Sequence, residues 1–471
     1  MRKISSALLV YPPTGVYDRF ERCQAPVESE SVSIMRPPLD LMYLAAILER
    51  NGIKVCIRDY PAIGKGWSGL AHDLKEIKPD LFLASVTVHT IHLDCLAFKV
   101  AKKANTDAIC VLKGFLPDCG RQAFVDCPEI DAVLREEAEL TLEELVRARP
   151  VEDIQGLSYR SNEGIRVNPD RVALVDLDLL PFPSRHLTDN NLYRMPDNNR
   201  KMGMVLLSKG CPRNCIFCLA PLVNNRRVRM RSPDSVIMEL EECVCKHGIT
   251  DFWFRADNFS VNRSWVLEVC EKIKNSRLPL RWATNSRVDS LDAEVVSVMK
   301  GAGCFAVGLG IESGSEETLK KIKKGITKEQ SVRAVRLCRS SGMQVYLFFV
   351  IGFPWEDSWH IKETISFARQ LEGDVINFSF AVPFPGTELF DISVKAGVLS
   401  PGKDYSGGNY GVPLTGTLYL SRDELVKMEK SAYRSIIFNP AYILRNLGRI
   451  RSFRQGICYL RAGAHLTKLC T

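Results

Sequence analysis

The sequence predicts an α/β protein with an N-terminal doubly wound parallel sheet, a partial (β/α)6 barrel and a basic helical C-terminal region. Three observations support this. Strand-like and helix-like apolar runs alternate in both halves of the chain. The length of 471 residues fits two to four domains. The composition, 46% apolar and 25% charged, is typical of a globular protein with substantial cores.

Residues 1–150 alternate between strands and helices and are expected to form the doubly wound sheet. The apolar stretch near the N-terminus is too short for a secretory signal and is better interpreted as a buried strand. Ligands of such sheets bind at the carboxyl ends of the strands, near the switch point. The expected elements are Ala7–Tyr11, Leu39–Asn51, Lys54–Asp59, Leu81–Val86, Leu93–Ala104, Ala108–Leu112, Ala132–Leu134 and Leu140–Val146.

Residues 151–198 lack a clear period and are expected to be a linker, because they contain Leu180-Pro-Phe-Pro-Ser184. Residues 199–400 alternate again and predict the barrel, with its chemistry at the carboxyl ends of the strands. The six expected strands lie at Val205–Ser208, Asp251–Arg255, Leu280–Thr284, Phe305–Leu309, Val345–Ile351 and Ile376–Ala381.

Residues 401–471 are expected to be basic and helical. From Ser421 onward, ten Lys/Arg face three Asp/Glu, so this segment carries +7 of the chain's net charge of +8. A solvated helical face is the commoner meaning of such a run. The alternative is an amphipathic surface for anionic lipid or an anionic substrate, because apolar residues interleave with the arginines. Nucleic acid is not expected, since no basic-aromatic platform accompanies the charge.

Sixteen cysteines without a signal peptide indicate a reducing, cytoplasmic compartment, with membrane association left open. The longest strongly apolar run, Val345 to Phe353, is too short to span a membrane. Scattered single cysteines are expected to act as small buried apolar residues.

Three cysteines, Cys211, Cys215 and Cys218, form a C-x3-C-x2-C motif. Three thiolates can hold three irons of a [4Fe–4S] cluster and leave the fourth iron open. Phe217 could present its ring beside whatever binds there. A zinc site is the alternative, but it needs four ligands, and no second cysteine pair or histidine follows at the required spacing.

This motif resembles that of the radical S-adenosylmethionine (radical SAM) superfamily. The order and spacing of further segments in residues 199–400 are similar to the branch that carries an N-terminal B12-binding domain. These segments are Arg287-Val-Asp289, Gly308-Leu-Gly-Ile-Glu-Ser-Gly-Ser315, Lys324-Gly-Ile-Thr327, Ile351-Gly-Phe-Pro-Trp-Glu356 and Pro383-Phe-Pro-Gly-Thr-Glu388.

The resemblance implies contacts to S-adenosylmethionine from Phe217, Asp257, Glu312 and Ser313, and one from Arg287. Asp257 occupies the place where the family binds the amino group of this cofactor. For Arg287 a second interpretation stays open, because it could instead pair with an acidic neighbour and tie the barrel together.

Residues 1–150 resemble the B12-binding domain in the version without the Asp-x-His-x-x-Gly motif. The resemblance implies that Pro13, Ser85, Thr87 and Gly114 meet cobalamin. Two loops depart from the family. Lys113-Gly-Phe-Leu116 stands in place of Gly-Gly-Pro-His, and Arg135-Glu-Glu-Ala-Glu139 in place of Arg-Gly-Glu-Gly-Glu. Both departures remove glycine, so binding of cobalamin and its loss both stay open.

The resemblance implies a radical enzyme. An external donor such as flavodoxin or ferredoxin would reduce the cluster, and cleavage of S-adenosylmethionine would give a 5′-deoxyadenosyl radical that abstracts hydrogen from an unactivated carbon. With cobalamin the outcome is methylation of a small-molecule substrate, a lipid or natural-product intermediate. Without cobalamin it is cyclisation, coupling or rearrangement. A non-catalytic metal-binding protein is the alternative from another class, and a methylthiotransferase would need a second cysteine trio.

Overall fold

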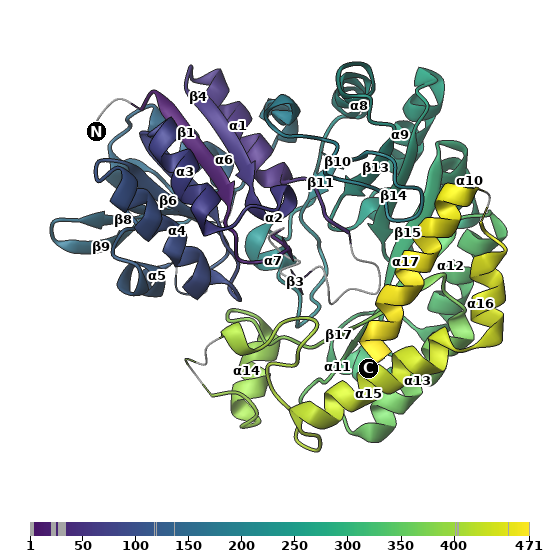
Figure 1. The fold of residues 1–471 in the computed structure, drawn as a ribbon. Helices are drawn as coiled ribbons and strands as arrows, with labels where there is room; N and C mark the ends of the chain where they lie inside the picture. Colours follow the sequence, from purple (N-terminus) through teal and green to yellow (C-terminus); the bar gives the residue numbers. More distant parts are fainter. Residues whose placement is uncertain are drawn as a thin grey trace. The chain divides into compact units, whose positions relative to one another are not determined.

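The computed structural model describes residues 4–19, 25–26, 34–116, 118, 120–135, 137–400, 402, 405–450 and 452–470. The chain forms two compact units (Figure 1). The first consists of Met1–Gln24, Pro37–Leu192 and Leu222–Asn225, and the second of Ala25–Arg36, Tyr193–Pro221 and Arg226–Thr471.

The first unit contains a seven-stranded sheet in the order β4-β1-β5-β6-β7-β8-β9. Its first five strands are parallel, and β8 and β9 extend it as an antiparallel hairpin. The predicted doubly wound sheet is therefore confirmed, with its switch point beside β1. The strands are β1 (Ser6–Tyr11), β4 (Lys54–Asp59), β5 (Leu81–Ser85), β6 (Ile109–Lys113), β7 (Ala132–Leu134), β8 (Leu157–Ser161) and β9 (Gly164–Val167).

Helices cover both faces of this sheet because its central strands are apolar on both sides. In β1, Leu9 packs into one core with α1 and α6, whereas Leu8 packs into the other with α3, α4 and α5. The helices of this unit are α1 (Leu39–Arg50), α2 (Tyr60–Ile63), α3 (Trp67–Ile77), α4 (Ile91–Ala104), α5 (Arg121–Asp126) and α6 (Ala138–Val146), and the second half of α7 (Ala220–Val223) also belongs to it.

The hairpin β8–β9 lies within the segment for which the sequence showed no period. Only Leu157 and Ser158 of β8 are buried, and β9 alternates between exposed and half-buried residues. The pair stands at the edge of the sheet, so it carries too little apolar periodicity to be seen in the sequence. The predicted domain limits themselves stay a prediction.

The second unit contains a six-stranded, all-parallel sheet in the order β10-β13-β14-β15-β16-β17. Each strand pairs with the next one along the chain, and helices cover the outside (Figure 1), which confirms the partial (β/α)6 barrel. The strands are β10 (Met202–Leu206), β13 (Asp251–Arg255), β14 (Arg281–Ser286), β15 (Cys304–Glu312), β16 (Gln344–Ile351) and β17 (Val375–Phe380).

The helices of the barrel follow their strands as the sequence predicts. The described residues also form the short strand pair β11–β12 and the short strands β2 and β3. Their bounds are β2 (Tyr17–Asp18), β3 (Ala25–Pro26), β11 (Ser208–Lys209) and β12 (Arg229–Met230). The helices are α8 (Pro233–His247), α9 (Arg263–Ser276), α10 (Ala293–Gly301), α11 (Glu316–Lys321), α12 (Lys328–Ser340), α13 (Ser358–Leu371), α14 (Glu388–Lys395), α15 (Arg422–Ile437), α16 (Pro440–Leu447) and α17 (Phe453–Cys470).

A capping box fixes the start of α12. The Thr327 hydroxyl accepts from Gln330 N at 3.3 Å, and the Gln330 side chain accepts from Thr327 N at 2.9 Å. Both hydrogen bonds satisfy backbone N–H groups that the start of a helix leaves without a partner in the helix. The connection that carries Lys324 therefore ends at a defined point.

The amino ends of the barrel strands are closed by ionic contacts and by the C-terminal helices. Arg281 donates to Asp251 at 3.0 Å, and its guanidinium lies 3.3 Å from the centre of the Phe305 ring. Asp374, immediately before β17, pairs with Arg449 at 2.9 Å, and its carbonyl accepts from the Tyr442 hydroxyl at 3.1 Å. The basic segment therefore packs at the end of the barrel opposite to the carboxyl ends of the strands.

None of the helices within the described ranges is both long and apolar enough to cross a membrane.

A buried carboxylate shapes the loop that follows β16. Glu356 accepts from Gly352 N at 2.8 Å, Phe353 N at 3.1 Å and the Thr318 hydroxyl at 3.2 Å. Burial raises the pKa of Glu356 to about 7, although these hydrogen bonds favour the charged form. Glu356 therefore holds the turn in which Gly352 has a positive φ of 86°.

A buried ionic network lies at the carboxyl edge of the first sheet. Arg19 donates to Asp94 at 2.8 Å and to the Ser85 carbonyl at 3.0 Å, and the side chains of Arg19 and Asp94 are fully buried. Beside it, Lys113 donates to Asp40 at 2.8 Å. Removing one partner of such a pair leaves an uncompensated buried charge.

We expect Arg19→Met to lower the free energy of unfolding by about 3–5 kcal/mol, because it strands Asp94 without its counter-charge. The control is Arg263→Met. Arg263 also bonds two carboxylates, Asp292 and Glu294, but its side chain is 51% exposed, so solvent screens these contacts and their loss should matter much less. Urea unfolding of both variants measures the difference. Equal losses would contradict this account.

We expect Glu356→Gln to change how stability depends on pH. The pKa of Glu356 rises from its ordinary 4.5 to about 7 on folding, so the native state binds more protons than the unfolded state in that window. The wild type should therefore lose roughly 3 kcal/mol relative to the variant as pH rises from about 4.5 to above 7. Unfolding curves across this range measure it, and parallel curves would refute it.

Candidate active site

The cysteine loop follows β10 and β11 and is held on several sides. Gly210, with a positive φ of 92°, donates its N–H to Asp257 at 2.8 Å. Ile216 donates its N–H to the Ile322 carbonyl at 3.2 Å, and its carbonyl accepts from Leu389 N at 3.0 Å. These contacts place the loop at the carboxyl ends of the barrel strands.

The three cysteines of this loop are half-buried and not disulfide-bonded. The Cys215 carbonyl accepts from Cys218 N at 3.2 Å, so the last two cysteines share one turn. The described part of the chain contains no group of three His, Cys, Asp or Glu side chains gathered closely enough for a single metal ion. A donor set of three thiols, without histidine, fits an iron–sulfur cluster with one open iron.

Two cations lie near these thiols. Burial raises the pKa of the Cys215 thiol, and the positive charges of Lys324 and Arg287 oppose that rise. A cluster needs its cysteines as thiolates. Lys324 and Arg287 therefore supply positive charge where the bound cluster would bring negative charge.

A buried ion pair stands beside the cysteine loop. Lys324 Nζ donates to Glu312 Oε1 at 2.5 Å, and both side chains are about one-tenth exposed or less. Glu312 has a positive φ of 67°, and the pairing of β15 with β16 shifts register between Gly310 and Glu312. A non-glycine residue in this conformation persists only when its surroundings hold it.

Sequence reasoning did not pick out Lys324 as a site residue. It ends a run with four lysines in five positions, Lys320 to Lys324, which is the pattern of a solvated surface. The segment Lys324-Gly-Ile-Thr327 resembles the family, but nothing in it shows that its lysine is buried.

Arg287 donates to Asp289 at 2.9 and 3.1 Å and to the Lys324 carbonyl at 2.7 Å. Arg213, inside the cysteine motif, joins Asp289 at 3.1 Å. Two interpretations were open for Arg287. In the structure, it pairs with an acidic neighbour, Asp289. The same pairing joins β14 to the Lys324 connection and to the cysteine loop.

Ser313 and Asp257 also serve the protein's own loops. The Ser313 hydroxyl is fully buried, lies 3.0 Å from the Thr364 hydroxyl and accepts from Ser315 N at 3.1 Å. Asp257 accepts from Gly210 N. The structure thus brings Asp257, Arg287 and Glu312 around the cysteine loop and encloses the side chain of Ser313. Their contacts to S-adenosylmethionine stay predictions.

Glycines in β15 leave no room for a side chain. A Cβ at Gly308 would lie 2.2 Å from Asn285 Oδ1, and one at Gly310 would lie 2.4 Å from Glu312 Oε1. Asn285 Oδ1 is also buried without a hydrogen-bond partner among the described residues, as are the hydroxyls of Ser286 and Ser208. Polar atoms of this kind at strand ends fit a polar ligand such as S-adenosylmethionine.

Phe217 lies 5.9 Å from Phe353, measured between ring centres. Phe353 in turn stacks on Trp355 at 5.4 Å. The ring beside the last cysteine is therefore one of three aromatic rings in contact, and Glu356 fixes the turn that carries the other two.

The residues predicted to meet cobalamin lie together at the carboxyl edge of the first sheet. The Ser85 hydroxyl donates to Asp40 at 2.9 Å, and the Thr87 hydroxyl lies 2.8 Å from that of Thr90. A Cβ at Gly114 would lie 2.8 Å from the Val86 carbonyl oxygen. Ser85 and Thr87 therefore use their hydroxyls within the protein, whereas Pro13 is partly exposed. This edge fits a ligand through its loops and backbone rather than through these two hydroxyls.

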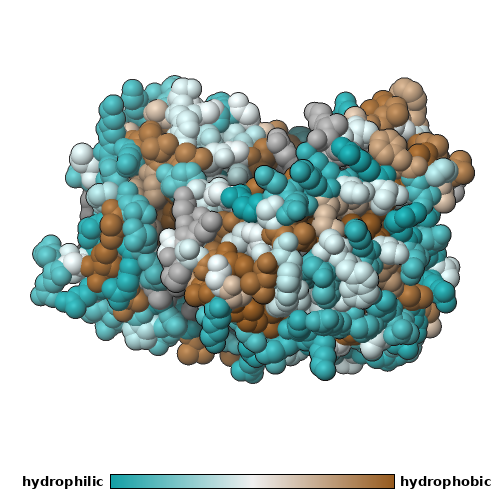
Figure 2. Space-filling view, turned by 90° about the horizontal axis from the view of Figure 1, so that it is seen from below, coloured by the Kyte–Doolittle hydropathy of each residue, from teal (hydrophilic) through white to brown (hydrophobic). Residues whose placement is uncertain are grey.

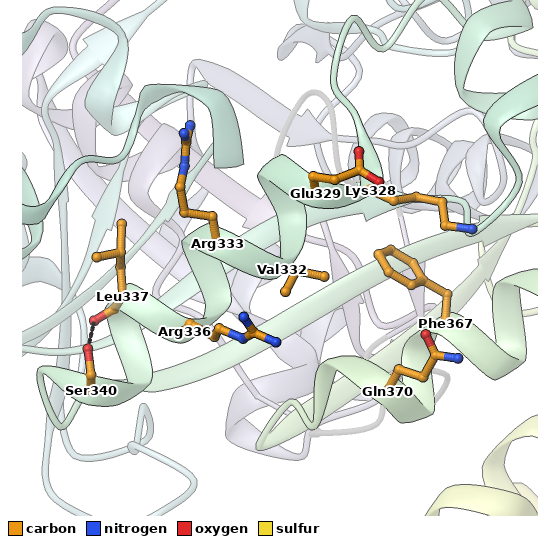
Figure 3. Close-up of a pocket in the computed structure, with 9 residues that line it drawn as sticks. All are labelled: Lys328, Glu329, Val332, Arg333, Arg336, Leu337, Ser340, Phe367 and Gln370. Carbon is orange, nitrogen blue, oxygen red and sulfur yellow. Dashed lines mark hydrogen bonds between the residues drawn. The ribbon is translucent and has the colours of Figure 1, made fainter.

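A groove of about 610 Å³ lies between α12 and α13 (Figure 3). Val332, Leu337 and Phe367 form its apolar part, and Lys328 Nζ lies 5.4 Å from the centre of the Phe367 ring. None of the sequence-predicted site residues lines it.

Comparison with known proteins relates the chain to one family. The family model of the radical SAM superfamily matches residues 205–368. An "uncharacterized methyltransferase" of Pyrococcus horikoshii is 32% identical over 454 residues, which covers 94% of this chain and 95% of that protein. The "anaerobic magnesium-protoporphyrin IX monomethyl ester cyclase" of Rubrivivax gelatinosus is 26% identical and covers 86% of this chain and 75% of its own length.

Solved structures share the fold of the whole chain. The radical S-adenosylmethionine methyltransferase TsrM from Kitasatospora setae, with cobalamin and a [4Fe–4S] cluster bound, has a TM-score of 0.68 and 19% identity, covering 99% of this chain and 89% of that one. The cobalamin-dependent radical enzyme OxsB, with aqua-cobalamin and S-adenosylmethionine bound, has a TM-score of 0.70 and 16% identity, covering 99% and 72%. The chain therefore belongs to the radical SAM superfamily, in the branch that joins this barrel to an N-terminal B12-binding-like domain.

Proposed function

We propose that this protein is a cobalamin-dependent radical SAM methyltransferase that methylates an unactivated carbon of a lipid or natural-product intermediate. The observation that supports this proposal most directly is the arrangement of the candidate site. A three-thiol loop, a buried Lys324–Glu312 pair and a glycine-lined strand meet at the barrel mouth. The near full-length relative from Pyrococcus horikoshii that bears the name methyltransferase supports the reaction class.

We assign Cys211, Cys215 and Cys218 as the cluster ligands. When bound, the cluster and S-adenosylmethionine supply a 5′-deoxyadenosyl radical, and cobalamin supplies the methyl group. The protein's own part is to hold these groups and exclude water. Lys324 and Arg287 balance the charge of the cluster, and the aromatic rings around Phe217 cover one side of the loop.

S-adenosylmethionine would lie against the carboxyl ends of β14 and β15. There Asn285 and Ser286 offer buried polar atoms, and Gly308 and Gly310 leave the room that the side chains of Asn285 and Glu312 occupy. Glu312 and Asp257 add carboxylates near the loop. A positively charged sulfonium ligand with polar ends suits this mixture of carboxylates and open polar groups.

Cobalamin would bind residues 1–150 at the carboxyl edge of the parallel sheet, where doubly wound folds bind ligands. Pro13 and the backbone around Gly114 would face it. The cobalamin-bound solved structures that share the fold support this placement.

The second candidate is radical cyclisation, coupling or rearrangement without cobalamin. It is favoured by the similarity to the protoporphyrin ester cyclase of Rubrivivax gelatinosus and by the two departures from the family's glycine loops.

The family acts on small molecules and needs a reductant. We propose flavodoxin or ferredoxin as the donor, a cytoplasmic location, and a peripheral membrane contact through the basic C-terminal region. We also propose the division at residues 150, 198 and 400 as the functional domain limits.

We expect Cys215→Ser to abolish binding of the cluster, because the variant keeps only two of the three thiolates that would hold it. After anaerobic reconstitution, iron content should collapse, and formation of 5′-deoxyadenosine should fall by more than about 100-fold. Cys245→Ser, at an exposed cysteine on α8, is the control and should keep both. Full activity of Cys215→Ser would refute the assignment.

We expect the reconstituted protein to retain stoichiometric cobalt after loading with hydroxocobalamin and removal of the unbound fraction. Gly114→Ala should keep iron but lose cobalt, because its Cβ would lie 2.8 Å from the Val86 carbonyl oxygen and displace the strand ends. Gly66→Ala, with open space at its Cβ, is the control. Iron without cobalt in the wild type would contradict methylation and favour the second candidate.

A further inference from the structure

Helix α16 turns polar side chains toward the barrel and apolar side chains outward. On the inward side of α16, Tyr442 and Arg445 bond the carbonyls of Asp374 and Gly373 at 3.1 and 2.9 Å. On its outward side, Leu444 is 70% exposed and Leu447 is 55% exposed. This arrangement is the reverse of an ordinary surface helix, whose apolar stripe faces the core.

Helix α17 also exposes large apolar side chains. Cys458 is buried, and Tyr459 shares a side-chain hydrogen bond with Gln344 at the start of β16. The opposite side carries Phe453, which is 87% exposed, and Leu460, which is 77% exposed.

These exposed residues are concentrated in one stretch of the chain. Single exposed apolar residues are normal, but a cluster marks a binding surface. Among the described residues, seven of the 19 large exposed apolar side chains fall between residues 438 and 460. Figure 2 shows one face of the molecule, on which apolar residues form separate patches among hydrophilic ones. We call the C-terminal set the apolar face: Phe438, Ile443, Leu444, Leu447, Phe453, Ile457 and Leu460.

We propose that the apolar face docks on an anionic lipid membrane, lying in the interface between head groups and acyl chains. The apolar face is set in a segment of net charge +7, and this combination is the one an anionic bilayer complements. Exposed leucines and phenylalanines match acyl chains, while arginines such as Arg461 lie within reach of lipid phosphates from the same helix.

The charge argues against a second copy of the chain as the occupant. A two-fold interface pairs the same patch with itself, so two segments of +7 would meet. Like charges across an interface oppose association. The inference deepens the membrane contact proposed above and is independent of the reaction at the barrel mouth.

The test is sedimentation of the full-length protein with vesicles. The wild type should bind vesicles of equal parts phosphatidylcholine and phosphatidylglycerol. It should bind more weakly to vesicles of phosphatidylcholine alone. The double variant Leu444→Glu, Leu447→Glu should bind the anionic vesicles at least roughly tenfold more weakly. Raising salt from about 0.1 M to about 1 M, which shortens the screening length from about 10 Å to about 3 Å, should weaken wild-type binding.

The matched control is Val172→Glu, Val175→Glu. These valines are 76% and 55% exposed in the first unit, so the control makes the same change in net charge without touching the apolar face. It should bind nearly as the wild type does. Thermal melting checks that both double variants fold, and Leu460→Glu on α17 provides a second, independent variant.

Three outcomes would overturn the proposal. The first is no binding of the wild type to anionic vesicles. The second is equal loss of binding in the control, which would reduce the effect to net charge. The third is a wild-type dimer in solution that Leu444→Glu, Leu447→Glu dissociates, which would make a second copy the occupant. None of these readouts uses catalysis, so failure here is distinguishable from failure of the proposed reaction.

Discussion

The contact between Lys324 and Glu312 joins the parts of the barrel mouth that the chemistry needs. Glu312 ends β15 in a conformation that other residues must hold, and Lys324 lies in the segment between α11 and α12. The carbonyl of Lys324 accepts from Arg287 after β14, and Arg287 binds the carboxylate that also binds Arg213 in the cysteine motif. One buried pair thus ties two strand ends, one connection and the cluster loop. Its two charges offset each other, and the lysine lies near the thiols.

The sequence was sufficient to predict both sheets because their strands are apolar runs that alternate with helices. The predicted strand Lys54–Asp59 coincides with β4, and Asp251–Arg255 coincides with β13. It failed at β8–β9, where an edge hairpin has few buried residues to set a period. The cysteine motif could be found because its spacing is local. Lys324 stood in a family-like segment, but its role could not be predicted, because the burial of a lysine depends on which strand ends surround it.

Arg287 and Ser313 illustrate a second limit of sequence reasoning. A motif tells which residues stand near a ligand, but it does not tell whether a side chain faces the ligand or the protein. In this structure Arg287 is engaged by Asp289, and the Ser313 hydroxyl is enclosed between Thr364 and Ser315. The first sheet shows the same division, because Ser85 and Thr87 sit at the ligand-binding edge with their hydroxyls already bonded. The side chains of such residues bond other protein groups and so hold the loops of the site in place.

The C-terminal helices pack on the amino ends of the barrel strands, and the cysteine loop stands at the carboxyl ends. A molecule moored to a bilayer by those helices would turn its reactive opening toward water. A substrate dissolved in the acyl chains could not slide sideways into that opening. It would have to leave the bilayer, extend a head group or tail outward, or arrive on a carrier. The direction of the strands therefore bears on how a lipid intermediate could reach the radical.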